Sequence, residues 1–255
     1  MLRTLMAGAM GALMNILLSP VAVAAHVLRY DEENHSVQQW CMHTWARMIC
    51  WAGGVKVVLH GAEHIVPGQG VVYVSNHVSW FDVFAIAKIL PKYTFVAKAE
   101  LRRIPFFGWG AEGAGVVFMA RGDRKVAFEV YDEIAAKVKN GLCVVVFPEG
   151  TRSRSYSLGP FKKGPFVLAI ASGAPVIPLV VYGTRQVMPK GAWRVRSNTV
   201  HVHLLPPVET AGYGYEHRHE LTRTVWQNIT DTLRDVYGEG SSVDANASAR
   251  LERLA

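Results

Sequence analysis

Apolar residues fill two long stretches at the start of the chain and then recur in short runs up to about residue 237. The first stretch, residues 5–28, is almost wholly apolar, and the second, residues 36–54, carries three tryptophans in a helix-like pattern. About 20 apolar residues are enough for a helix to cross a bilayer. The pattern therefore predicts an N-terminal apolar hairpin of two helices.

From Val55 onward, strand-like runs of β-branched residues alternate with helix-like segments. The predicted strands are 55–60, 71–75, 94–97, 115–119, 142–147, 176–182 and 199–205. The predicted helices are 79–90, 123–140, 164–172 and 216–236. This alternation is typical of an α/β fold. We expect a single α/β domain at 55–237, with a mixed, largely parallel sheet flanked by helices, between the helical segment 1–54 and a disordered tail at 238–255.

The two N-terminal stretches each admit more than one interpretation. Arg3, the apolar run and the small residues 22–24 suit a cleaved signal peptide. A retained helix could instead span the membrane, with a kink at Pro20, or lie embedded in it without spanning. Segment 36–54 is either an interfacial helix, because Trp and Arg suit the headgroup region, or a core helix of the globular domain.

Composition and charge point toward lipid. Hydrophobic residues make up 50% of the 255 residues, charged residues only 18%, and the net charge is +7. Such a chain suits an anionic membrane surface or a phosphorylated, lipid-like ligand. Nucleic acid is not expected as a partner, because Lys and Arg are scattered and no nucleic-acid-binding motif is present. The three cysteines lack disulfide or ligand spacing, which favours a reducing compartment. We therefore favour a retained N-terminus at the cell membrane, with the site on the cytoplasmic side.

The first candidate for chemistry is the turn after the predicted strand 71–75. His77 and Asp82 lie where this strand gives way to a helix, and active sites of α/β proteins usually lie at the carboxyl ends of strands. Asp82 could orient the imidazole and leave one ring nitrogen free as a base. Ser79 and Asp82 also have the spacing of a capping box, which needs no function. The spacing leaves both interpretations open.

Cationic residues follow three other predicted strands. Arg152, in the segment 147–153, could bind a phosphate through two parallel hydrogen bonds, although Pro and Gly in this segment also suit an ordinary turn. Lys98 and Arg121 come just beyond the strands 94–97 and 115–119. If those strands are neighbours, their cations converge on the edge of the sheet that carries His77.

Other chemistry is not expected. His201 and His203 share one face of a predicted strand without companion Cys, Asp or Glu, so we expect structural histidines and no metal site. Cys143 lies in the middle of an apolar strand, a setting that raises the pKa of a thiol and disfavours a nucleophile. No dinucleotide-binding or Walker-type loop is present, and no cofactor is predicted.

Four blocks, taken in order, resemble the motifs of the glycerophospholipid acyltransferases. They are Asn76-His77-x4-Asp82, Gly115-x2-Phe118-x2-Arg121, Phe147-Pro148-Glu149-Gly150-Thr151-Arg152-Ser153 and Val176-Ile177-Pro178-Leu179. The resemblance is closest to bacterial 1-acylglycerol-3-phosphate acyltransferases and covers about residues 55–205. The stretch 98–108 and the apolar N-terminal pair of helices also match that family. Each block alone is unspecific, whereas four in the right order are specific.

The resemblance implies transfer of a fatty acyl group from a thioester of coenzyme A or acyl carrier protein to the sn-2 hydroxyl of lysophosphatidic acid, giving phosphatidic acid. The acyl thioester is a co-substrate, and no cofactor is implied. His77 is then the base and Asp82 its orienter. The implied acceptor ligands are Lys98, Arg121, Glu149, Gly150, Thr151 and Arg152, and the implied acyl-pocket residues are Ile177 and Pro178.

Several rival functions stay open at this level. The acceptor could be glycerol 3-phosphate, another lysophospholipid or a lyso-aminolipid. A thioester hydrolase would use the same base on water, and would release free fatty acid whether or not an acceptor is present. A non-catalytic membrane-binding module would need only the apolar N-terminus and the basic surface. The presence of His77, Asp82 and Arg152 together argues against such a module.

Overall fold

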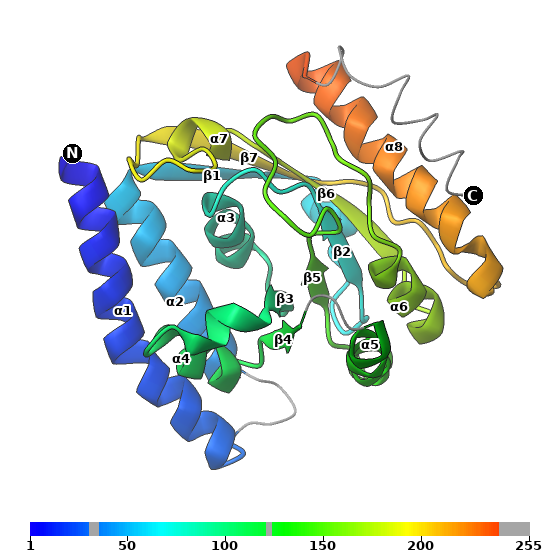
Figure 1. The fold of residues 1–255 in the computed structure, drawn as a ribbon, viewed down its shortest axis with the longest axis horizontal. Helices are drawn as coiled ribbons and strands as arrows, with labels where there is room; N and C mark the ends of the chain where they lie inside the picture. Colours follow the sequence, from blue (N-terminus) through cyan, green and yellow to red (C-terminus); the bar gives the residue numbers. More distant parts are fainter. Residues whose placement is uncertain (31–35, 121–123, 240–255) are drawn as a thin grey trace.

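The computed structural model of the protein describes residues 1–30, 36–120 and 124–239. These residues contain a seven-stranded sheet in the order β1-β7-β6-β2-β5-β3-β4 (Figure 1). The strands are β1 (Val55–His60), β2 (Val72–Ser75), β3 (Thr94–Lys98), β4 (Val117–Met119), β5 (Val144–Val146), β6 (Val176–Tyr182) and β7 (Asn198–Leu204). Neighbouring strands are parallel except β6 and β7. The predicted mixed, largely parallel sheet is confirmed.

Helices cover both faces of this sheet (Figure 1). One face carries α2 (Ser36–Gly53) and α3 (Phe81–Ile89), with α1 (Leu2–Val27) outside α2. The other face carries α5 (Arg124–Lys139), α6 (Gly164–Ser172) and α8 (Arg218–Tyr237). Shorter elements are α4 (Phe107–Gly113), α7 (Thr184–Val187), η1 (Ala62–His64), η2 (Ala99–Arg103) and η3 (Tyr215–His217). The short helices α4 and α7 were not predicted, because neither is long enough to display a helical period.

The β-branched runs of the central strands are buried on both faces because side chains alternate along a strand. On β2, Tyr73 packs into the core shared with α2 and α3, whereas Val72 and Val74 pack into the core beneath α5, α6 and α8. Buried residues of α1 and α2 belong to the first of these cores. The N-terminal helices are therefore packed into the same hydrophobic core as the sheet.

The N-terminal helices differ in how they meet their surroundings. By length and composition, α1 could cross a membrane, and it contains Pro20. Its outer face leaves Leu5 and Leu17 more than half exposed. Helix α2 buries Ala46 completely against the core but leaves Trp51 65% exposed. The buried face of α2 agrees with a core helix, whereas its placement at a membrane interface stays a prediction.

Two predictions concern residues outside the described ranges. These are the placement of Arg121 at the edge of the sheet and the disorder of the tail beyond residue 239. The last described helix, α8, ends at Tyr237, and its C-cap Gly238 has the positive φ of 66° that favours glycine.

Candidate active site

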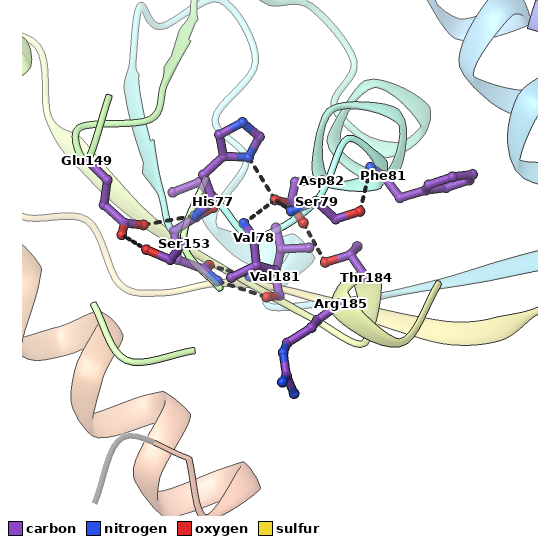
Figure 2. Close-up of polar contacts among 12 residues, drawn as sticks. His77, Val78, Ser79, Phe81, Asp82, Glu149, Ser153, Val181, Thr184 and Arg185 are labelled. Atoms are coloured by element: carbon purple, nitrogen blue, oxygen red, sulfur yellow. Dashed lines mark hydrogen bonds and ion pairs between the residues drawn. The ribbon is translucent and has the colours of Figure 1, made fainter. Parts of the chain in front are cut away.

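His77 lies in the turn between β2 and α3, at the carboxyl end of β2 (Figure 2). Its Nδ1 is 2.8 Å from Oδ2 of Asp82, and the imidazole stacks on the Phe147 ring with the ring centroids 4.0 Å apart. Asp82 is completely buried, and the His77 side chain is 15% exposed. A carboxylate only accepts hydrogen bonds, so Nδ1 carries the proton and Nε2 is left as the acceptor. The imidazole is thus held in one orientation with Nε2 available as an acceptor, as a general base requires.

The same carboxylate also organises the turn. Oδ2 of Asp82 accepts the backbone N–H groups of Val78 at 2.7 Å and Ser79 at 2.8 Å. The Ser79 hydroxyl accepts the N–H of Phe81, the first residue of α3. Asp82 therefore holds both the His77 ring and the turn before α3. The N-cap of α3 is Trp80, without a side-chain cap hydrogen bond, so the predicted capping box with Ser79 at the N-cap is not formed.

Asn76, the residue just before His77, is held in place by two hydrogen bonds of its side chain. Its side-chain Nδ2 donates to the Val181 carbonyl at 3.0 Å, and its Oδ1 accepts the Val181 N–H at 2.8 Å. The amide therefore continues the pairing of β2 with β6 by one position. Asn76 is completely buried. Sequence reasoning gave Asn76 no role, although Asn side chains commonly take the place of backbone partners.

Glu149, in the loop after β5, braces the turn that carries the base (Figure 2). Its Oε1 accepts the His77 N–H at 3.1 Å, and its Oε2 accepts the Ser153 hydroxyl and the Gly159 N–H. The Ser153 N–H donates to the His77 carbonyl at 2.7 Å. Burial raises the pKa of Glu149, and these hydrogen bonds oppose the rise. The carboxylate ties two loops together, and its implied contact with an acceptor stays a prediction.

An apolar cavity of about 400 Å³ opens beside His77. Its walls come from α1, α2, α3, β3 and α4, which contribute among others Met14, Leu18, Ala22, Met42, Trp45, Phe95, Phe107 and Ala111. Its polar lining residues include His77, Lys98, Thr151 and Arg152. A mostly apolar cavity with a few polar groups suits a ligand that has an apolar chain and a polar head.

The cations that line the cavity have defined neighbours. The Arg152 guanidinium lies 5.0 Å from the centroid of the Trp80 ring, which also lines the cavity. Lys98 Nζ is 2.7 Å from Glu100 Oε1. Gly150 has a φ of 71°, and a Cβ there would lie 2.9 Å from Cε of Lys162. The structure thus brings Lys98, Gly150 and Arg152 together with His77 on one cavity.

Two implied acyl-pocket residues lie elsewhere. Ile177 and Pro178 are buried in β6, opposite Tyr73 and Val74 of β2, and neither is among the described residues that line the cavity. Their apolar side chains are part of the buried interior around β6. The apolar walls come instead from the predicted elements α3 and β3, from the N-terminal helices α1 and α2, and from α4, which was not predicted.

A cysteine in the cavity wall is unsuited to covalent catalysis. Cys41 lines the cavity, but burial raises the pKa of its thiol to about 11, so the thiol stays protonated near neutral pH. Ser79 is also engaged, because its hydroxyl donates to the Met188 carbonyl at 2.7 Å. Within the described ranges, no group of three His, Cys, Asp or Glu residues is arranged to hold a metal ion.

A second group of histidines lies on β1 and β7. His60 Nε2 is 3.0 Å from His201 Nδ1, and the rings of His60 and His203 stack with centroids 4.3 Å apart. His203 Nε2 is 2.6 Å from the Tyr237 hydroxyl of α8. Burial, followed by the charge of His60, lowers the pKa of His203 to about 4. This cluster joins α8 to the sheet, as expected for structural histidines.

Comparison with known proteins identifies the family. The Acyltransferase family model matches residues 56–182. The chain is 31% identical to a 1-acyl-sn-glycerol-3-phosphate acyltransferase of Cocos nucifera, over 82% of this chain and 68% of the relative. It is 33% identical to the chloroplastic enzyme BAT2 of Brassica napus, over 69% of this chain, but spans only about half (52%) of that relative.

A solved structure has the same fold over nearly the whole chain. The crystal structure of the 1-acyl-sn-glycerophosphate acyltransferase PlsC from Thermotoga maritima superposes with a TM-score of 0.80 at 27% identity. The match covers 94% of this chain and 97% of that one. The chain therefore belongs to the acyltransferase family that includes the 1-acyl-sn-glycerol-3-phosphate acyltransferases.

Proposed function

We propose that this protein transfers a fatty acyl group from an acyl thioester to the sn-2 hydroxyl of 1-acylglycerol 3-phosphate, which gives phosphatidic acid. The observation that carries the proposal is an oriented imidazole, His77, that shares a largely apolar cavity with Lys98 and Arg152. The names of the relatives and of the PlsC structure state the same acceptor for those proteins.

The residues support a direct transfer. Nε2 of His77 accepts the proton of the sn-2 hydroxyl as the oxygen attacks the thioester carbonyl carbon. The new C–O bond forms, the C–S bond breaks, and the leaving thiolate takes the proton back from the imidazolium. Asp82 stabilises the transient imidazolium through Nδ1. An acyl-enzyme on Cys41 or Ser79 is disfavoured, because the Cys41 thiol is protonated and the Ser79 hydroxyl donates to the Met188 carbonyl.

The acceptor phosphate would bind the cationic groups beside the base. Arg152 has the planar fork that binds a phosphate through two parallel hydrogen bonds, and its position over Trp80 limits its freedom before binding. Lys98 would add a second cation, and Thr151 a hydroxyl. The apolar part of the cavity would hold an acyl chain, with its reacting end toward His77.

The N-terminal helix supports action at a membrane. Met14, Leu18 and Ala22 of α1 line the cavity, so removal of α1 as a signal peptide would open the cavity to solvent. The exposed apolar face of α1 would lie in the bilayer, and the net charge of +7 would favour an anionic surface. We place the protein at the cell membrane with the site on the cytoplasmic side, where acyl-CoA or acyl carrier protein can supply the acyl group.

An acceptor panel tests the proposal. The full-length protein in mixed micelles would receive one labelled acyl-CoA with lysophosphatidic acid, glycerol 3-phosphate, a lysophosphatidylcholine or a lyso-aminolipid. We expect labelled phosphatidic acid as the dominant product, formed at least about 100-fold more slowly by His77→Gln. A preference for another acceptor would reassign the substrate. Acceptor-independent release of labelled fatty acid would indicate a hydrolase.

A further inference from the structure

A hydroxyl from outside the motif blocks contacts the catalytic pair. Thr184, the first residue of α7, donates its side-chain hydroxyl to Oδ1 of Asp82 (Figure 2). Thr184 is completely buried. It lies beyond the fourth block at 176–179 and beyond residue 182, where the match to the family model ends. Neither the motifs nor the family match assigns it a role.

The donors to Asp82 are unevenly divided between its two oxygens. Oδ2 accepts from His77, Val78 and Ser79, whereas the Thr184 hydroxyl is the donor that the described residues supply to Oδ1. A buried carboxylate oxygen without a donor is costly, since no water replaces the missing hydrogen bond. Without Thr184, the carboxylate would gain by rotating toward other donors, and the contact with Nδ1 of His77 would loosen.

The backbone just before Thr184 is fixed by the contacts of Gly183. Gly183 has a φ of 95°, and a Cβ there would lie 2.4 Å from the Thr199 carbonyl oxygen, so glycine is needed. The Gly183 N–H donates to the Tyr156 hydroxyl at 2.7 Å, and Asn198 Nδ2 donates to the Gly183 carbonyl at 2.9 Å. These bonds present the Thr184 hydroxyl in one position, which is what an orienting group requires.

We propose that Thr184 is a positioning residue for acyl transfer, whose hydroxyl holds the Asp82 carboxylate in the orientation that keeps His77 ready to accept a proton. The inference rests on the proposed function, because His77 must act as the base. It extends that function by placing a third member behind the His-Asp pair. Thr184 acts through Asp82 and has no part in binding either substrate.

The role has a signature that a packing role lacks. The hydroxyl stabilises the carboxylate when His77 is neutral. Its loss lets the carboxylate rotate away from Nδ1, so the imidazole is no longer held in one tautomer. The ring-nitrogen signals of His77 should therefore change, which loss of packing alone would not cause. Because substrate contacts are unchanged, the loss should fall on kcat and leave KM near its original value.

Three variants of the full-length protein provide the test. Thr184→Val keeps the shape and removes the hydroxyl, Thr184→Ser keeps the hydroxyl, and Thr210→Val removes a comparable buried hydroxyl that donates to the Ala174 carbonyl away from the site. We expect about a 10-fold loss of kcat in Thr184→Val, as for one lost hydrogen bond to a charged group. We expect Thr184→Ser and Thr210→Val to keep near-normal kcat.

Histidine-ring nitrogen NMR tests the same inference without turnover, with His77→Gln identifying the signal. We expect one Nδ1–H tautomer in the original protein and a mixture in folded Thr184→Val; if that variant unfolds, Thr184→Ala replaces it. An unchanged tautomer together with unchanged kcat would overturn the role of Thr184. Equal damage from Thr184→Ser would do the same. If the original protein acylates none of the acceptors, the proposed function fails, while the NMR result still decides the orienting contact.

Discussion

His77 lies in the turn after β2, and the cluster of His60, His201 and His203 lies on β1 and β7; of these, only His77 is equipped for proton transfer. His77 has a carboxylate on Nδ1 and exposes its other nitrogen to a cavity, where Nε2 makes no hydrogen bond with the described residues. His203 is packed between His60 and Tyr237, its Nε2 is engaged by the Tyr237 hydroxyl, and burial lowers its pKa to about 4. A base needs an orienting anion and a free nitrogen, and His77 has both.

The largest expected difference comes from matched substitutions of His77 and of His203 in the cluster. Glutamine has about the size of histidine but cannot accept a proton near neutral pH. We expect His77→Gln to lower kcat for acyl transfer between about 100- and 10,000-fold, the range for loss of a general base. We expect His203→Gln to keep the original kcat, since its Nε2 faces Tyr237. Similar losses of kcat in both folded variants would contradict the distinction between His77 and the histidine cluster.

The next effect concerns the orienting anion. In Asp82→Asn, the side-chain amide can donate to Nδ1 of His77, which leaves the proton on Nε2 and removes the acceptor. We expect kcat to fall by about 100-fold, near the lower end of the range for acid–base catalysis. Asp235→Asn, at an exposed residue of α8 paired with Arg234, serves as the control. Full activity in folded Asp82→Asn would show that the tautomer does not matter.

A smaller effect separates the acceptor site from the base. Arg152→Ala should raise KM for lysophosphatidic acid by about 10- to 100-fold, because it removes hydrogen bonds between charged groups that are worth about 1.5 to 3 kcal/mol. Arg154→Ala, at an exposed residue outside the cavity lining, is the matched control. An unchanged KM in Arg152→Ala would remove Arg152 from the acceptor site.

The smallest effect tests the structural histidines through stability. In the unfolded chain His203 takes up a proton near its ordinary pKa of 6.5, whereas the folded protein resists it until about 4. The stabilisation is therefore complete above about pH 6.5 and is lost progressively as the pH falls toward 4.

Urea unfolding should give a smaller free energy of unfolding at about pH 5 than at about pH 7, and this difference should be smaller in His203→Gln. Some loss should remain in that variant, because burial and His60 also lower the pKa of His201. If His203→Gln shows the same pH dependence as the original protein, His203 does not titrate as its surroundings imply.

The His77 turn was predictable because its parts are close in the sequence. His77 and Asp82 lie five residues apart in one strand-to-helix turn, and the sheet itself follows from runs of β-branched residues. The strands before Lys98 and Arg121 are neighbours, as the prediction required, and Lys98, at the end of β3, lines the cavity together with Arg152. Local spacing and the rule that parallel strands end at one edge were sufficient here.

The cavity and the support behind Asp82 were not predictable in the same way. The cavity wall combines α1, α2 and α4, whose apolar residues look alike in sequence whether they face lipid, core or cavity. For the same reason, the apolar character of Ile177 and Pro178 does not distinguish an acyl pocket from the buried interior around β6, where both residues lie. Thr184 and Asp82 are 102 residues apart in the sequence, and the residues around each do not predict the contact.

The pH dependence of acyl transfer, measured for the original protein and for the residual activity of His77→Gln, tests the central claim most directly. If His77 takes the proton of the acceptor hydroxyl, the original protein loses activity as the pH falls, because a protonated imidazole cannot accept a second proton. The residual activity of His77→Gln should lack that acidic limb, while His203→Gln keeps it. The same acidic limb in His77→Gln would contradict the role of His77 as the base.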